Sequence, residues 1–197
     1  MPPTAPGDGG DPCVAVTAMA PARQRPGARP DEEHPMLVRT VPALTYAGAR
    51  VALDAALVRA EELGVAVNVA VADASGAVLA FARMDGAFAA SGDIARDKAR
   101  TVTAFGGLST ADLHVAVAAE PSVREGITHR AGVAAFPGGV PVRVDGALVG
   151  AVGVSGGSAA EDSDVATAGA TALASLVAAH TTAVPAHLQP VPREALP

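Results

Sequence analysis

The chain has 197 residues, of which 50% are hydrophobic but only 3% aromatic, so we expect one core built mainly from alanine, valine and leucine. A formal net charge of -6 leaves no basic patch, which argues against DNA or RNA as a partner. No apolar run, that from Val149 to Val154 included, approaches the roughly 20 residues that span a bilayer, so no membrane partner is expected.

The two ends of the chain differ in composition from its middle. Residues 1–36 hold eight of the 16 prolines and show no sustained periodicity, which predicts a disordered leader. Residues 37–183 are expected to form one domain, and the proline-rich residues 184–197 a flexible tail. Cys13 is the only cysteine and no secretory signal is evident, so we predict a cytoplasmic protein without an intrachain disulfide.

The first patterned segment predicts a helix followed by a β-hairpin. Apolar residues recur at helical spacing from Leu44 to Leu63, and the glycine that follows is typical of a helix end. Two alternating apolar segments, Val65–Ala72 and Val78–Met84, flank turn-forming residues. They predict a pair of antiparallel strands.

The middle of the chain predicts helices. Ser91–Phe105 has acidic residues near its start and two glycines after its end, as a helix does. Ser109 or Thr110 is expected to cap a shorter helix that runs to Ala118. A further helical turn is expected around residues 122–130, before a Pro-Gly-Gly break.

The last third predicts a second hairpin and a final helix. Val140–Val144 and Ala147–Ser155 flank an Asp-Gly pair, the strongest short hairpin signal in a sequence. Ser158 and Glu161 have the spacing of a capping box, and Val165–Ala179 is an alanine-rich helical segment. The resulting order predicts an α+β fold in which helices pack on an antiparallel sheet.

Five short blocks of sequence fall in one register across about residues 43–180. They are Val71 to Gly76, Arg83 to Ala87, Lys98-Ala99, Gly138 to Pro141 with Asp145-Gly146, and Gly150 to Gly156 with Asp162. In order and spacing these blocks resemble the signature of the GlcG/HbpS-like proteins, also found as the C-terminal module of PduO-type cobalamin adenosyltransferases. The resemblance implies a profilin-like fold, with helices flanking a central antiparallel sheet, and assembly into a homo-oligomer.

The same resemblance implies a small ligand, with heme or a related tetrapyrrole as the cofactor. The expected binding residues are Arg83, Met84, Asp85, Gly86, His129, Gly138, Gly139 and Pro141. Heme needs an axial ligand, and His129, just upstream of the glycine-rich loop, is the candidate for the iron. His114 is a second candidate, and for both histidines the competing interpretation is a solvated or locally hydrogen-bonded ring. Tyr46 and Met84 could also ligate iron, but we expect them in the core or an interface.

The alternative hypothesis is a cofactor-independent enzyme, a lyase, cyclase or isomerase that acts on a small organic molecule. Lys98, Asp73 and His129 would then serve as acid and base groups. The competing structural interpretation is that Asp73 satisfies a turn backbone and that Asp85 pairs with Arg83 or Lys98. The glycines at 138–139 and 153–157 would in either hypothesis offer backbone N–H groups to a carboxylate or a heme propionate.

Overall fold

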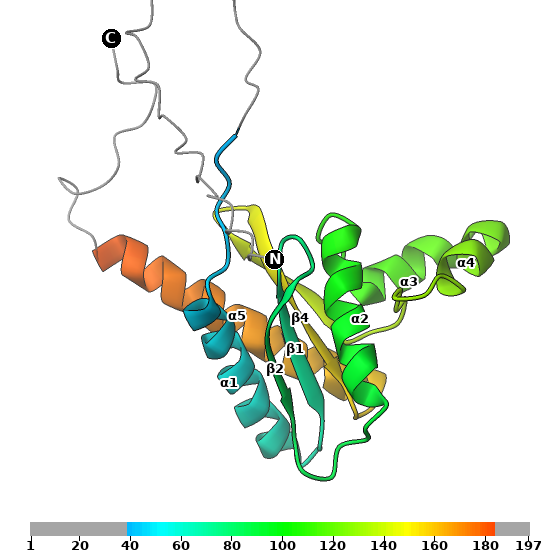
Figure 1. Ribbon diagram of the computed structural model, residues 1–197, viewed down its shortest axis with the longest axis horizontal. Helices are drawn as coiled ribbons and strands as arrows, with labels where there is room; N and C mark the ends of the chain where they lie inside the picture. Colours follow the sequence, from blue (N-terminus) through cyan, green and yellow to red (C-terminus); the bar gives the residue numbers. More distant parts are fainter. Residues whose placement is uncertain (1–38, 184–197) are drawn as a thin grey trace, which may run out of the picture. The chain divides into compact units, whose positions relative to one another are not determined.

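The computed structural model describes residues 39–183, so the predictions for residues 1–36 and 184–197 lie outside the described part. Its elements in chain order are α1 (Tyr46–Leu63), β1 (Asn68–Asp73), β2 (Val78–Arg83), α2 (Ser91–Ala104), α3 (Thr110–Ala118), α4 (Pro121–Thr128), β3 (Gly139–Val144), β4 (Ala147–Ser155) and α5 (Ala159–Ala183). The predicted α+β class and the two hairpins are confirmed (Figure 1).

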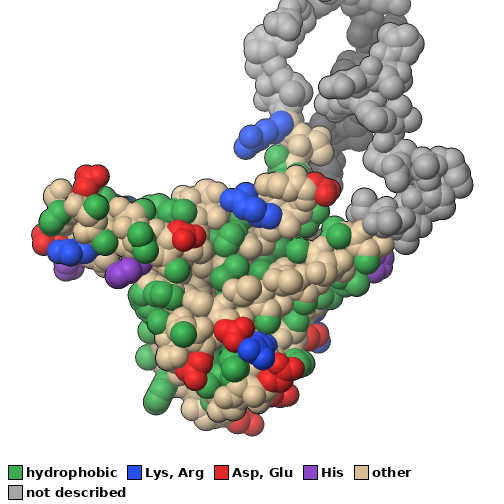
Figure 2. Space-filling model, turned by 180° about the vertical axis from the view of Figure 1, so that it is seen from behind, with side chains coloured by type: hydrophobic (Ala, Val, Ile, Leu, Met, Phe, Trp, Pro, Cys, Tyr) green, Lys and Arg blue, Asp and Glu red, His purple; other side chains and the backbone are tan. Residues whose placement is uncertain are grey.

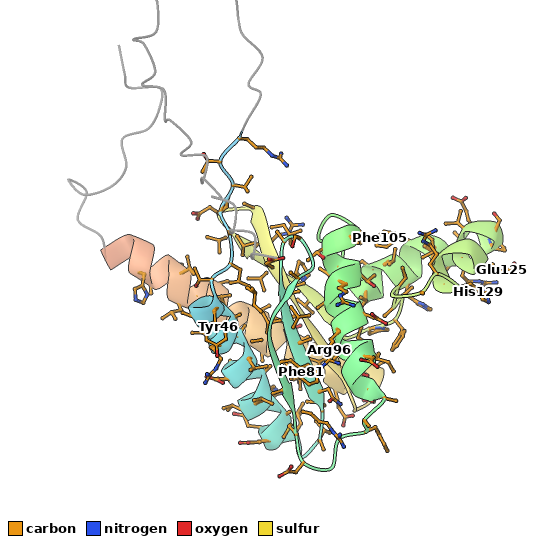
Figure 3. All side chains as sticks on the ribbon, in the orientation of Figure 1. Tyr46, Phe81, Arg96, Phe105, Glu125 and His129 are labelled. Carbon is orange, nitrogen blue, oxygen red and sulfur yellow. The ribbon has the colours of Figure 1, made fainter. Side chains whose placement is uncertain are left out.

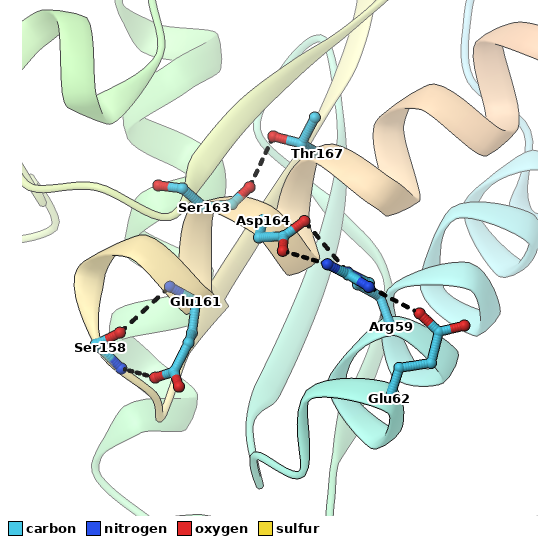
Figure 4. Close-up of polar contacts among 7 residues, drawn as sticks. All are labelled: Arg59, Glu62, Ser158, Glu161, Ser163, Asp164 and Thr167. Atoms are coloured by element: carbon cyan, nitrogen blue, oxygen red, sulfur yellow. Dashed lines mark hydrogen bonds and ion pairs between the residues drawn. The ribbon is translucent and has the colours of Figure 1, made fainter.

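Local capping signals set the helix ends. Thr45 caps α1, its hydroxyl accepting a hydrogen bond from the backbone N–H of Gly48 at 3.1 Å. Gly64 ends the helix with φ 70°, a left-handed conformation that suits glycine. The capping box of Ser158 and Glu161 starts α5 earlier than the alanine-rich segment predicts (Figure 4). None of the helices between residues 39 and 183 is long and apolar enough to cross a membrane.

The four strands form one antiparallel sheet in the order β2-β1-β4-β3. Each hairpin contributes two neighbouring strands, and the pairing of β1 with β4 joins the hairpins. In this register Asn68 lies opposite Arg83 on β2 and opposite Ser155 on β4. The three polar residues therefore form a row across one end of the sheet, on the face that α2 covers.

The two faces of the sheet carry side chains of different size. Figure 1 shows the sheet between α2 on one side and α1 with α5 on the other. Valines cover the face toward α1 and α5, among them Val69, Val71, Val152 and Val154. Alanines and glycine cover the face toward α2, where a Cβ on Gly153 would lie only 2.6 Å from the backbone nitrogen of Ala99. Small residues thus bring α2 unusually close to the sheet.

Helices α1 and α5 pack against each other through alanines and one glycine. Ala49, Ala52 and Ala56 on α1 are fully buried, and Gly169 on α5 faces them. At the exposed rim, Arg59 on α1 donates to Asp164 on α5 at 2.6 Å and to Glu62 at 2.9 Å (Figure 4). Small side chains set the distance between these two helices, and the ion pair links them at their exposed rim.

Helices α3 and α4 form an arm beside α2. Their small cluster of buried residues consists of Leu113, Val117 and Ala135, with Phe105 and Ile127 packed against it. None of the residues of α4 is buried. Seen from behind in Figure 2, this arm carries apolar side chains among charged ones. The arm is the least tightly packed of the described elements.

Candidate functional site

The predicted residues Arg83 to Gly86 form the turn that follows β2. Arg83 donates its Nε–H to the carbonyl of Ala87 at 3.1 Å. Its neighbour in the sheet, Asn68, donates Nδ2–H to the carbonyl of Phe88 at 3.0 Å. These two hydrogen bonds fix the turn. Phe88 lies at the surface, where its side chain is 71% exposed. The other predicted residues of this turn differ in burial: Met84 packs against the core, whereas Asp85 and Gly86 are exposed.

Both candidate histidines are bonded to nearby backbone carbonyls. His129 ends α4, and its Nδ1 lies 2.6 Å from the carbonyl oxygen of Glu125. The Nδ1 of His114 lies 3.1 Å from the carbonyl oxygen of Ala135. Figure 3 places His129 at the far end of α4, away from Tyr46 and Phe81. The structure therefore matches the interpretation of locally hydrogen-bonded histidines, and it leaves only Nε2 of His129 for a ligand.

The predicted glycine-rich loop is buried rather than open. The backbone N–H of Gly139 donates to the Thr110 hydroxyl at 2.8 Å, and the carbonyl of Gly138 accepts from Val154 at the same distance. The N–H of Gly157 is likewise used by Asp162, at 3.0 Å. Pro141 lies within β3 and is half-buried. Of the backbone N–H groups expected to bind an anion, those of Gly139 and Gly157 are thus already paired within the protein.

The predicted catalytic groups do not converge. Asp73 accepts hydrogen bonds from the Ser75 hydroxyl at 2.6 Å, the Ser75 N–H at 2.8 Å and the Ala77 N–H at 3.1 Å. These bonds, above all that from the Ser75 hydroxyl, hold the pKa of Asp73 below its usual value. The turn interpretation of Asp73 is therefore confirmed. Lys98, Asp73 and His129 lie on different elements and share no hydrogen-bond partner.

Lys98 is the most unusual charged residue of the described chain. Its side chain is 0% exposed. Nζ donates to Asp162 Oδ2 and to the carbonyl of Val154, each at 2.8 Å. The predicted pairing of Lys98 with Asp85 is wrong, because Asp162 on α5 lies against the ammonium group while Asp85 is at the surface. Burial lowers the pKa of Lys98 from its usual value, and the bond to Asp162 only partly opposes that effect.

The surroundings of this ion pair are closely packed. A Cβ on Gly138 would lie 2.6 Å from Nζ of Lys98 and 2.9 Å from Cβ of Asp162, and φ of Gly138 is 118°. Only glycine fits at that position. The ring of Phe136 lies over the ammonium group, 4.6 Å from Nζ to the ring centroid, and is 43% exposed. Phe136 therefore separates Lys98 from solvent.

Asn68 is a polar residue that the sequence reasoning missed. It is fully buried at the start of β1, and its Oδ1 is the one buried side-chain nitrogen or oxygen atom among the described residues that lacks a hydrogen-bond partner. The sequence feature that could have identified Asn68 is an asparagine within a run of β-branched and small residues. The bond from its amide nitrogen to Phe88 gives it a positioning role for the turn after β2.

An open groove runs along β2, the strand at one edge of the sheet. Its volume is about 380 Å³, and it is lined by Tyr46, Arg50, Leu53, Asp54, Leu79, Ala80 and Phe81. We call it the α1–β2 groove. Tyr46 is 60% exposed at this groove, so it does not belong to the core, which was one of the two places expected for it. Figure 3 shows Phe81 beside Arg96, whose guanidinium carbon lies 3.9 Å from the ring centroid.

Polar groups of α1 meet at this groove. Hydrogen bonds to Tyr46 and Asp54 raise the pKa of the Arg50 guanidinium above its usual value. The groove thus combines a phenol, a guanidinium and the apolar side chains of Leu53, Leu79 and Phe81. Small-molecule sites commonly have this mixture of an apolar wall and a few polar groups.

Solved structures of similar proteins share this fold. A structure described as a PduOC:Heme complex is 32% identical with a TM-score of 0.62, and the match covers 66% of this chain and 95% of that one. A double mutant of Streptomyces reticuli HbpS is 34% identical with a TM-score of 0.61, covering 77% of this chain and 97% of that one. These similarities support the profilin-like arrangement expected from the sequence blocks.

Sequence comparison also relates the chain to these proteins. The corrinoid adenosyltransferase PduO of Citrobacter freundii is 37% identical over 115 residues, which cover 57% of this chain and 33% of PduO. The chain therefore matches only about a third of that relative's length. A family model described as "Haem degrading protein HbpS-like" matches residues 44–171. The chain belongs to the HbpS-like family.

Proposed function

We propose that this protein binds heme or a related tetrapyrrole in the α1–β2 groove, with Tyr46 as the axial ligand. The observation that carries the proposal is the exposed Tyr46 phenol beside Arg50 at an open groove lined by both polar and apolar residues. A heme complex in a structural relative with 32% identity supports the choice of ligand. Heme, when bound, supplies an iron centre for redox chemistry.

The residues of the groove fit the needs of a heme group. Tyrosine is an established type of axial ligand to heme iron. Arg50 can pair with a propionate, since guanidinium and carboxylate groups form two parallel hydrogen bonds. Leu79 and the edge of Phe81 would contact the macrocycle, whereas Leu53 beneath them is only 6% exposed. The groove therefore places a candidate axial ligand, a cation and some apolar side chains within one site.

Two other places fit heme less well. A hollow of about 220 Å³ lies between the start of α1, the β3–β4 hairpin and α5, but no side chain that lines it is of a type that ligates iron. His129, proposed from the sequence, lies on a helix without buried residues. A ring at that position lacks the apolar slot that a porphyrin needs.

A hemin titration of the purified protein tests the proposal. The Soret band should shift with saturable one-to-one binding in the wild type, and Tyr46→Phe should weaken binding about tenfold or more because iron loses its oxygen ligand. Tyr46→Phe removes only the hydroxyl, so the fold should be unchanged by circular dichroism.

His129→Ala is the matched control. Unchanged binding in this variant would support the groove, whereas loss in His129→Ala with retention in Tyr46→Phe would move the ligand to α4. No saturable shift in the wild type would remove heme as the ligand. We also propose a homo-oligomer, as the family resemblance implies, and light scattering that finds only a species of the 19.3 kDa chain mass would contradict it.

A further inference from the structure

Lys98 is the only lysine in the chain. The sequence contains 14 lysines and arginines, and every other member of this set is arginine. The one primary amine carried by a side chain is also the one cation with 0% exposure among the ion pairs of residues 39–183. A group that differs in chemistry from all other cations thus occupies the most buried position.

Stability does not explain why an ion pair is buried here. Desolvation of two charges usually offsets their attraction, and well-packed apolar residues serve a core as well or better. Arginine would provide more hydrogen bonds to Asp162, but it lacks the property that distinguishes lysine, an amine that can lose its proton and act as a nucleophile. Burial lowers the pKa of Lys98 and so favours that neutral amine.

We propose that Lys98 is a nucleophile that forms an imine with the carbonyl group of a small aldehyde or ketone, assisted by Asp162. The geometry that carries this proposal is the 2.8 Å contact between Nζ and Asp162 Oδ2 beneath the half-exposed ring of Phe136. This activity is independent of heme binding, since Lys98 does not line the α1–β2 groove.

The reaction balances with these two residues and the carbonyl compound alone. The Lys98 ammonium gives a proton to the Asp162 carboxylate, and the neutral nitrogen attacks the carbonyl carbon. Asp162 passes its proton to the carbonyl oxygen and takes one from nitrogen, which yields a carbinolamine. Asp162 then protonates the hydroxyl, which leaves as water while the nitrogen lone pair forms the C=N bond. The product is a protonated imine on Lys98, paired with the Asp162 carboxylate.

Asp162 is held in the orientation that this role requires. Its Oδ1 accepts the N–H of Gly157 at 3.0 Å, so Oδ2 is directed to Lys98. It lies in the first turn of α5, where the helix dipole favours the carboxylate. The proton-accepting oxygen is therefore fixed against the amine.

Phe136 controls access to the amine. It belongs to the segment between α4 and β3, and its ring is 43% exposed although it covers a fully buried group. The buried hydrogen bonds of Gly139 and Ala134 on either side of Phe136 do not involve its side chain, so they hold the backbone independently of the ring. Removal of the ring should therefore expose Lys98 while the fold persists.

The experiment is reductive trapping on the full chain. The protein is incubated with propanal or benzaldehyde and sodium cyanoborohydride, and adducts are located by peptide mass spectrometry. Labelling of Lys98 should saturate with aldehyde concentration and be about tenfold faster in Phe136→Ala, since the ring no longer shields the amine. Asp162→Asn should slow it, because an amide cannot take the proton.

Lys98→Met is the control that removes the amine, and the α-amino group of the polypeptide reports non-specific labelling in every variant. Circular dichroism shows that each variant is folded under the labelling conditions. Two results would overturn the proposal. One is labelling of the α-amine without any Lys98 adduct in both the wild type and Phe136→Ala. The other is Lys98 labelling that is non-saturable or equally fast in Asp162→Asn.

Discussion

Gly169 on α5 lies so close to α1 that a Cβ there would be 2.5 Å from the carbonyl oxygen of Ala52. Gly169→Ala should therefore push the two helices apart and lower the free energy of unfolding by about 1–3 kcal/mol, despite the higher helix propensity of alanine. Urea denaturation monitored by circular dichroism measures the change.

Gly126→Ala is the matched control, since Gly126 lies in α4 and a methyl group added there would meet no atom within 4 Å. There the helix propensity of alanine should act alone and stabilise by about 0.5–1 kcal/mol. Equal effects at both positions would contradict the close approach of α1 and α5.

Removing one partner of the Lys98–Asp162 pair should lower the free energy of unfolding more than replacing both partners. Asp162→Asn leaves a buried ammonium without its counter-charge and should lower the free energy of unfolding by about 3 kcal/mol or more. The double variant Lys98→Met, Asp162→Asn removes both charges and should recover at least half of that loss. A double variant no more stable than Asp162→Asn would show that the charge is not the cause.

Asp73 should make stability fall in acid. Its pKa is lowered in the folded state, chiefly by the Ser75 hydroxyl, so its contribution is fully present above the unfolded pKa of about 3.9 and disappears as pH falls through the folded value. Asp73→Asn keeps an acceptor oxygen but cannot ionise. The wild type should be the more stable protein at neutral pH, and the two midpoints of unfolding should converge as pH falls below the unfolded pKa and through the lowered folded pKa of Asp73. A difference that stays constant with pH would exclude this ionisation as its source.

Asn68 should control the turn that presents Phe88. Asn68→Ala removes the bond to the Phe88 carbonyl, so the amides of residues 84–90 should exchange with deuterium faster. The loss of stability should be modest, about 1 kcal/mol, because Oδ1 of Asn68 is already unpaired. Ser155→Ala alters the residue opposite Asn68 in β4 and should leave exchange in the turn unchanged. Faster exchange in Ser155→Ala as well would indicate a general loosening of the sheet.

The secondary structure could be predicted because its signals are local. Gly64 and the Asp-Gly pair at 145–146 end or turn the chain by their own backbone preferences, and the structure has positive φ at each of them. The strand order β2-β1-β4-β3 could not be predicted from local signals of this kind. Pairing of β1 with β4 joins segments far apart in the chain, and periodicity carries no information about which strands become neighbours.

Local sequence signals also could not predict which residues meet at the candidate site. Lys98 stood out in the sequence, but its partner is Asp162, 64 residues away, and not the nearer Asp85. Tyr46 was expected in the core or an interface. The core is wrong, since the structure exposes Tyr46 at the groove, and a place in an interface stays a prediction, because a helical pattern predicts which faces are apolar and not what covers them. Chemistry-bearing residues were thus recognisable, whereas their partners required the fold.

Gly153 on β4 determines where α2 holds the amine of Lys98. It has no side chain, yet it allows α2 to lie against the sheet, and α2 carries Lys98 to the carbonyl of Val154. A methyl group at position 153 would lift the helix and withdraw the amine from its partners without touching either of them. The position of the Lys98 amine therefore depends on the absence of a side chain at residue 153.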